Sequence, residues 1–67
     1  MILPYSVTKI GVGCFQYCSN LKHINTDNII EFKSCCFVGC KNLEQLNLNN
    51  CKSIDEKCFE GCDKLKI

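Results

Sequence analysis

The chain has 67 residues, enough for one domain, and a chain this short buries only roughly 60% of the surface that its unfolded form exposes. Eight basic and seven acidic side chains give a formal net charge of +1, which argues against a nucleic-acid partner or an anionic membrane surface. No apolar run approaches the roughly 18 residues of a membrane span, and the first residues lack the pattern of a signal peptide, so we expect no membrane insertion.

A repeat of 22 residues runs through the chain without a gap. Phe15, Phe37 and Phe59 each directly follow a cysteine and are followed three residues later by another, and leucines and other apolar side chains recur at the same step of 22 residues. A constant period of about 20–30 residues is typical of a solenoid, because each coil buries its apolar side only against its neighbours. We therefore predict about three coils of 22 residues, with repeat units at 3–24, 25–46 and 47–67.

Each coil is predicted to contain two extended runs with a turn between them. In the first coil, residues 7–10 form a short extended run. The Cys-Phe-x-x-Cys string at 14–18 has apolar side chains at i, i+1 and i+4, which favours a single helical turn. Residues 21–26 have the L-x-x-L-x-L spacing of a strand, and residues 43–48 repeat it. The sequence thus predicts an α/β repeat solenoid with short parallel strands and single helical turns.

The apolar positions that recur at this step are expected to share one core along the stack. The predicted core residues are Ile10, Cys14, Phe15, Cys18, Leu21, Ile24, Ile29, Phe32, Cys36, Phe37, Cys40, Leu43, Leu46, Cys51, Ile54, Cys58, Phe59, Cys62 and Leu65. Cys35 aligns with Gly13 and Lys57, so we expect it at the surface, where it would be alkylated first.

Residues 3–24 resemble the BspA-like leucine-rich repeats, a short cysteine-bearing class. The stretch L-P-Y-S-V-T-K-I-G-V-G-C-F-Q-Y-C-S-N-L-K-H-I follows the family pattern L-P-x-x-V/L-x-x-I-G-x-x-A-F-x-x-C-x-x-L-x-x-I almost throughout. The chain departs from it at Cys14, Cys36 and Cys58, where the family usually has alanine. The resemblance implies a leucine-rich-repeat solenoid that binds other molecules, often on microbial cell surfaces, and a surface or secreted location. It carries over no catalytic residue and no ligand.

The eight cysteines allow four interpretations. Cys14, Cys18, Cys36 and Cys40 supply the four ligands of a zinc site, but stacking predicts rows of thiols rather than one focus. A redox motif needs an exposed, acidic thiol, and the C-x-x-C spacing is absent. The distance between stacked coils permits disulfides, whereas the parallel direction of stacked side chains opposes them. We favour free, buried cysteines that act as small hydrophobic side chains, with no metal and no cofactor.

The polar positions of the L-x-x-L-x-L runs are the candidate binding residues. Alternate side chains of an extended run point outward. The candidates are Lys22, His23, Asn25, Glu44, Gln45 and Asn47. The alternative interpretation is that they are ordinary solvated side chains, which are the default for exposed polar residues.

No nucleophile and base, phosphate-binding loop or paired carboxylate recurs, so we predict a non-enzyme without catalytic residues. The first functional hypothesis is a surface or adhesion module that binds a protein or a glycan. The alternative is a structural spacer or self-assembling fragment with no ligand of its own. Because Ile2 and Ile67 fall within strand positions and no polar cap is visible, we expect a longer array or end-to-end association.

Overall fold

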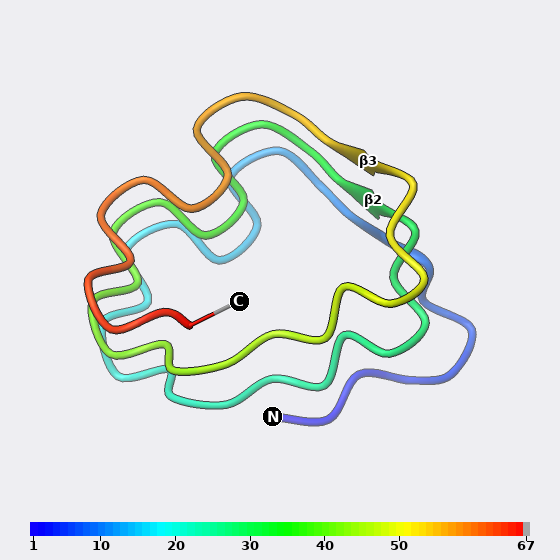
Figure 1. Ribbon diagram of the computed structural model, residues 1–67, viewed down its shortest axis with the longest axis horizontal. Helices are drawn as coiled ribbons and strands as arrows, with labels where there is room; N and C mark the ends of the chain where they lie inside the picture. Colours follow the sequence, from blue (N-terminus) through cyan, green and yellow to red (C-terminus); the bar gives the residue numbers. More distant parts are fainter. Residues whose placement is uncertain (67) are drawn as a thin grey trace.

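In the computed structural model, which describes residues 1–66, the chain winds into three coils that lie on one another (Figure 1). Strands β1 (Lys9–Ile10), β2 (Glu31–Phe32) and β3 (Ser53–Ile54) form a parallel sheet in the order β1-β2-β3. Ile10 pairs with Phe32, and Phe32 pairs with Ile54. The 22-residue step of the sequence is therefore also the step from one coil to the next.

The L-x-x-L-x-L runs lie opposite this sheet but are not regular strands. They are joined by two isolated parallel bridges, His23 with Gln45 and Gln45 with Lys66. The sequence predicted strands in these runs and another short extended segment at 7–10. The structure has its regular strands at the second of these places, in β1 and its equivalents. Ile67, which the sequence also placed at a strand position, lies outside the described residues. A side chain interrupts the ladder, because the N–H of Asn47 donates to the hydroxyl of Thr26 rather than to a backbone carbonyl.

The segments around the phenylalanines are hydrogen-bonded turns, and residues 1–66 contain no helix. The helical turns that the sequence predicted are therefore not found in these segments. The N–H groups of residues 14, 16 and 18 donate to the carbonyl three residues back, at 3.1–3.2 Å. The N–H groups of residues 13, 15 and 17 donate instead to residues 34, 36 and 38 of the next coil, at 2.6–3.1 Å. A helix needs every N–H for its own segment. Here alternate N–H groups bind the neighbouring coil.

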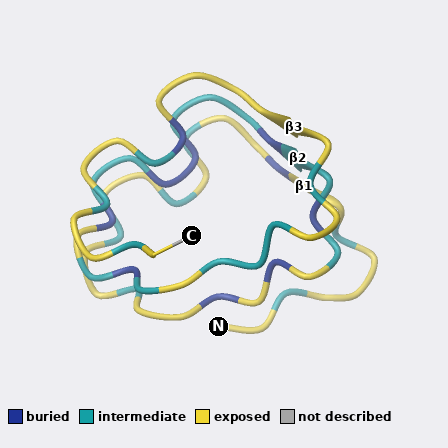
Figure 2. Cartoon of the chain, viewed as in Figure 1, coloured by how far each residue is buried: buried dark blue, intermediate teal, exposed yellow. Residues whose placement is uncertain are grey.

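The core is centred on the middle coil (Figure 2). Phe37 is fully buried and stacks on Phe15 with ring centroids 5.3 Å apart and on Phe59 at 5.9 Å. Phe32 lies across Phe37 and Phe59. The predicted core residues that are buried are Ile10, Ile24, Ile29, Phe32, Cys36, Phe37, Cys40, Leu43 and Cys58. Those that are half-buried against this cluster are Phe15, Cys18, Leu21, Leu46, Cys51, Phe59, Cys62 and Leu65.

Two predicted core residues, Cys14 and Ile54, are exposed, and their positions within the stack explain why. Ile10 is 2% exposed beneath the middle coil, whereas its equivalent Ile54 is 46% exposed because residues 1–66 provide no coil beyond the third. The cysteine equivalent to Cys14 in the third coil packs against the preceding coil instead. The Cys58 thiol lies 3.1 Å from the carbonyl of Lys33 in that coil. Cys14 has no preceding coil among the described residues. An inward-facing side chain is therefore buried only where the described chain includes the adjacent coil against which that side chain packs.

All eight cysteines are free, and several thiols bind the preceding coil. Cys40 donates to the carbonyl of Phe15 and Cys62 to that of Phe37, both at 3.1 Å. Burial raises the pKa of the Cys36, Cys40, Cys58 and Cys62 thiols. In the second and third strings, the second cysteine thus links adjacent coils through a hydrogen bond as well as filling space.

Cys35 is half-buried and Cys14 is exposed, so the expectation that Cys35 would be the most accessible thiol is wrong. The position in the stack gives the reason, because Lys57 has the same left-handed backbone (φ 61°, against 60° at Cys35) and is exposed. Cys35 lies in the middle coil, and its N–H donates to the carbonyl of Glu56 in the next coil at 3.3 Å.

Candidate functional site

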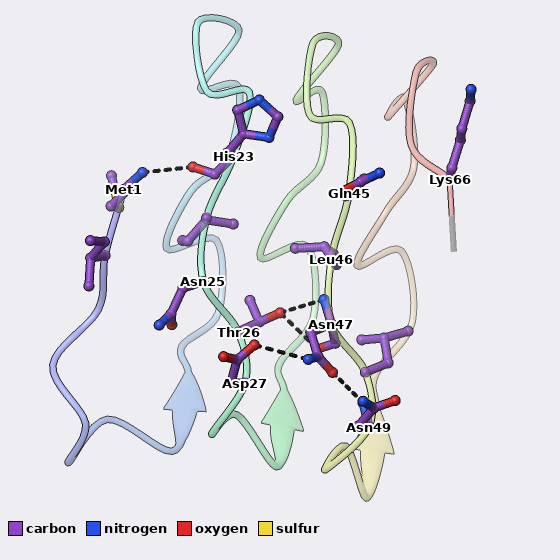
Figure 3. A pocket seen from close by; sticks show the side chains of 13 residues that line it. Met1, His23, Asn25, Thr26, Asp27, Gln45, Leu46, Asn47, Asn49 and Lys66 are labelled. Atoms are coloured by element: carbon purple, nitrogen blue, oxygen red, sulfur yellow. Dashed lines mark hydrogen bonds between the residues drawn. The ribbon is translucent and has the colours of Figure 1, made fainter.

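An open groove runs along the face where the extended segments of successive coils lie side by side (Figure 3). It is lined by residues 1–2, 23–27 and 45–49 and by Lys66. The groove crosses the stack, so its lining comes from four segments that lie side by side. Met1 ties the first of these to the second, because its ammonium group donates to the carbonyl of His23 at 2.8 Å and its own carbonyl accepts from the N–H of Asn25 at 3.1 Å.

Thr26 fixes the two central segments of the groove to each other. Its side chain occupies the last inward position of the first L-x-x-L-x-L run, where the next run has Leu48. Thr26 is 1% exposed, and its hydroxyl donates to the carbonyl of Asn47 at 2.8 Å and accepts from the N–H of Asn47 at 2.9 Å. One hydroxyl therefore satisfies both backbone groups of a residue in the next coil.

A chain of polar contacts borders the groove beside Thr26. The amide of Asn47 donates to the Asp27 carboxylate at 3.0 Å and accepts from the N–H of Asn49 at 2.8 Å (Figure 3). The amide of Asn50 donates to the carbonyl of Asp27 at 2.6 Å. Asn47 thus uses its side chain to hold this edge of the groove in shape.

The structure brings four of the six candidate binding residues to this groove. His23, Asn25, Gln45 and Asn47 line it, and the first three are exposed with no hydrogen bond from their side chains within residues 1–66. The imidazole Nε2 of His23 lies 3.7 Å from the carboxylate of Glu44, a pair that is ionic only when His23 is protonated.

Lys22 and Glu44, the other two candidates, lie outside the groove. Glu44 instead borders a second depression together with Gln45 and residues 63–66. Its backbone is also part of the stack, because its N–H donates to Lys22 at 3.0 Å and its carbonyl accepts from Lys66 at 2.9 Å.

Asp27 and Asn49 line the groove but were not among the candidates. A signal for them exists in the sequence. They are 22 residues apart and each follows an asparagine by two positions, Asn25 and Asn47 respectively. Short polar side chains are typical of turns as well as of groove borders, so this Asn-x-Asx pattern by itself does not distinguish the two.

Charged side chains beside the sheet pair with one another rather than forming a second site. Glu31 lies 3.1 Å from the ammonium group of Lys33 and 3.9 Å from that of Lys9. The hydrogen bond from Lys33 lowers the pKa of the Glu31 carboxyl, and the same contact raises the pKa of Lys33. Among residues 1–66, no three histidine, cysteine or acidic side chains are grouped as metal ligands. The described chain also has no helix with the length and apolar character to cross a bilayer.

Three stacked coils with one apolar pattern define this chain as a repeat module. It belongs to the BspA-type leucine-rich repeats, because a family model described as a BspA type leucine rich repeat region of six copies matches residues 1–67. The resemblance drawn from residues 3–24 is thereby confirmed. Neither the curated proteins nor the solved structures contain a match. Modules of this family are generally non-enzymatic and commonly occur in surface-associated proteins.

Proposed function

We propose that this chain is a short leucine-rich-repeat solenoid of a secreted or cell-surface protein that binds a protein or a glycan without catalysis. The observation that carries the proposal is that four positions selected as outward-facing from the repeat alone line a single groove. Three of them, His23, Asn25 and Gln45, have side chains free for a ligand. Extended surfaces built from successive coils are the usual binding surfaces of solenoids.

The chemistry of the groove favours a polar ligand without a strong net charge, because Asp27 and Lys66 contribute opposite charges to its lining. Two amides and one imidazole offer hydrogen-bond donors and acceptors together. The exposed Ile2 and the half-buried Leu46 add apolar surface to the lining. Peptide groups and sugar hydroxyls are ligands that match such a surface.

The groove is also held rigid by contacts within the chain. Thr26 joins its two central segments, and Asn47 is fixed at both ends of its side-chain amide. Because little ordering is then needed on binding, the conformational cost of capturing a ligand is low.

The test compares the parent chain with a groove variant, His23→Ala/Asn25→Ala/Gln45→Ala. The matched control is Gln16→Ala/Asn20→Ala/Lys41→Ala, which changes three exposed polar residues outside the groove. Each protein is applied to a glycan microarray and to a displayed library of random peptides. We expect the parent and the control to capture the same probes, the groove variant to lose them, and all three to have the same circular dichroism spectrum.

Capture that survives in the groove variant would contradict binding through this surface. If the parent captures no probe of either kind, the alternative of a structural spacer without a ligand is favoured instead.

A further inference from the structure

Cys36 and Cys58 occupy equivalent positions in the middle and third coils, and both are buried, at 0% and 2% exposed. Their backbones are joined directly, because the N–H of Phe37 donates to the carbonyl of Cys58 at 2.9 Å. Both cysteines also contact one carbonyl, that of Lys33, which accepts the N–H of Cys36 at 3.3 Å and lies 3.1 Å from the Cys58 thiol. The two residues are therefore neighbours across the interface between two coils.

The Cys58 side chain points across this interface toward the middle coil. Its thiol lies 3.3 Å from the carbonyl of Phe32 and 3.1 Å from that of Lys33, and 2.8 Å from that of Asp55 in its own coil. The Cys36 thiol is hydrogen bonded to the Cys58 thiol. Side chains that run parallel oppose a disulfide, whereas two thiols in contact do not.

The other cysteine row is arranged differently. The Cys40 thiol donates to the carbonyl of Phe15, and the Cys62 thiol donates to that of Phe37, each at 3.1 Å. In that row each thiol is directed to a backbone oxygen of the preceding coil. Contact between two thiols thus distinguishes Cys36 and Cys58 within the part of the chain that the structure describes.

We propose that Cys36 and Cys58 form a disulfide that joins the middle and third coils when the chain meets a small disulfide oxidant. Neighbouring parallel segments lie about 4.7–4.9 Å apart, which is within the separation of about 4.4–6.8 Å between the Cα atoms of a disulfide. A secreted or cell-surface setting, on which this role rests and which belongs to the proposed function, supplies such oxidants. The cross-link itself does not depend on the groove or its ligand.

The reaction consists of two thiol–disulfide exchanges. The Cys58 thiol loses its proton, and its sulfur attacks one sulfur of the oxidant R–S–S–R, which forms Cys58–S–S–R and releases R–S⁻. The Cys36 thiol then loses its proton, and its sulfur attacks the Cys58 sulfur and expels the second R–S⁻. The two protons are taken up by the two released thiolates. The protein dithiol is thereby oxidised to a disulfide, and R–S–S–R is reduced to two R–SH.

The contact between the two thiols determines which of them reacts first. Burial raises the pKa of both, but the hydrogen bond with Cys36 lowers that of Cys58, whereas the proximity of Cys58 raises that of Cys36 further. The thiolate is the attacking species, so Cys58 is the first nucleophile. Because both sulfurs are buried, the oxidant reaches them only when the third coil opens locally, and the reaction is slow.

The disulfide leaves the surrounding backbone satisfied. The carbonyl of Phe32 already accepts the N–H of Asp55 at 2.8 Å, and that of Lys33 accepts the N–H of Cys36. Asp55 is exposed, so water can replace the thiol at its carbonyl. The product carries no charge, so burying it avoids the cost of a buried thiolate.

The test treats the purified chain with oxidised glutathione in urea below the unfolding midpoint, where local opening is frequent. The remaining thiols are alkylated, and tryptic peptides are mapped by tandem mass spectrometry, which distinguishes Cys36 from its neighbour Cys35. Cys36→Ala and Cys58→Ala each remove one partner. Cys62→Ala removes a thiol of the other row from the same coil and is the matched control.

We expect the parent and Cys62→Ala to show a bond between Cys36 and Cys58, which joins peptides 34–41 and 58–64. Their urea midpoints should rise on oxidation, because the cross-link restricts the unfolded chain, and reductant should reverse the rise. Cys36→Ala and Cys58→Ala should form no bond between these coils and show no rise.

A parent chain without this bond, or with Cys40 bonded to Cys62 in its place, would overturn the proposal. So would an equal rise of the midpoint in Cys58→Ala. The peptide map of the parent decides the question even if an alanine variant does not fold. The groove variant defined above should oxidise like the parent, so failure of the binding proposal and failure of this one are separate results.

Discussion

Thr26 shows how a single polar residue can substitute for an apolar one inside a repeat. Its position is inward in the pattern, and its equivalent in the next coil is Leu48. The hydroxyl is tolerated there because both of its hydrogen bonds go to the backbone of Asn47, and no buried side-chain nitrogen or oxygen lacks a partner among the described residues. The residue fills the core and joins two coils at once.

Replacing Thr26 by valine keeps the shape but removes both hydrogen bonds and leaves the N–H of Asn47 without its acceptor. We expect the free energy of unfolding to fall by about 1–3 kcal/mol. Urea denaturation measures the change, and Thr8→Val at an exposed position serves as the control. Equal midpoints for the two variants would show that the Thr26 contacts contribute nothing to stability.

The buried thiols give the chain a stability that depends on pH. Because burial raises the pKa of Cys36, Cys40, Cys58 and Cys62, these thiols keep their protons in the folded chain. In the unfolded chain they titrate near the ordinary value of 9.0. Above that pH the unfolded state binds fewer protons than the folded state, so the free energy of unfolding falls as the pH rises. Below it, the contribution is fully present.

Urea midpoints measured from neutral pH to about pH 10 test this linkage. Cys36→Ala removes one buried thiol and should make the decline shallower than in the parent. A decline of the same steepness in both proteins would assign it to other groups, such as lysines.

At the scale of elements, the turns around the phenylalanines are the main departure from expectation. An apolar pattern at i, i+1 and i+4 is shared by a helical turn and by this arrangement, in which alternate N–H groups bind the next coil. The sequence contains a further signal, because Gly39 and Gly61 are equivalent to each other and to Tyr17. All three have φ between 59° and 79°, which is incompatible with a right-handed helix.

Gly39→Ala is expected to weaken the fold through this turn. The left-handed backbone costs about 1–2 kcal/mol for a residue with a Cβ. The added Cβ would also overlap the ring of Tyr17. Tyr17→Ala combined with Gly39→Ala should recover only the overlap part of the loss. Thermal unfolding provides the measurement.

Gly11→Ala is the matched control for that variant, since a Cβ there has no atom within 4 Å. Its stability should be unchanged or raised by up to about 1 kcal/mol, because alanine reduces the freedom of the unfolded chain. A Gly39→Ala protein as stable as Gly11→Ala would argue against the left-handed turn.

At the scale of the whole molecule, three coils provide only one fully covered layer. The middle coil contributes Phe32, Phe37 and Leu43, which are completely buried, whereas Phe15 and Phe59 are covered on one side. A domain of this length has a stability of roughly 0.05–0.15 kcal/mol per residue. The fold therefore depends strongly on the residues at the centre of the stack.

Phe37→Ala is expected to cost about 3–5 kcal/mol, which is enough to unfold much of the population. Phe59→Ala, at the end of the same aromatic row, should cost less because its ring is already partly solvated. Near-ultraviolet circular dichroism and urea denaturation distinguish the two. Similar losses for both would contradict a core centred on the middle coil.

The sequence alone determined the repeat, its 22-residue step, the family and most of the apolar interior. A side chain that recurs at each coil meets its own equivalents when the coils stack, so the period carries this information. The six binding candidates were also found by this rule, and four of them line one groove.

Only the tertiary structure decided which of the equivalent residues are buried and which hydrogen bonds leave a coil. Cys14 in the first coil and Ile54 in the third are exposed, although their equivalents in other coils are buried, because each packs toward a side of the stack where the described chain has no further coil. The alternate N–H groups that replace the helical turn, and the Thr26 hydroxyl that interrupts the strand ladder, likewise need the adjacent coil. Local spacing describes one coil, whereas these features are properties of the contact between two.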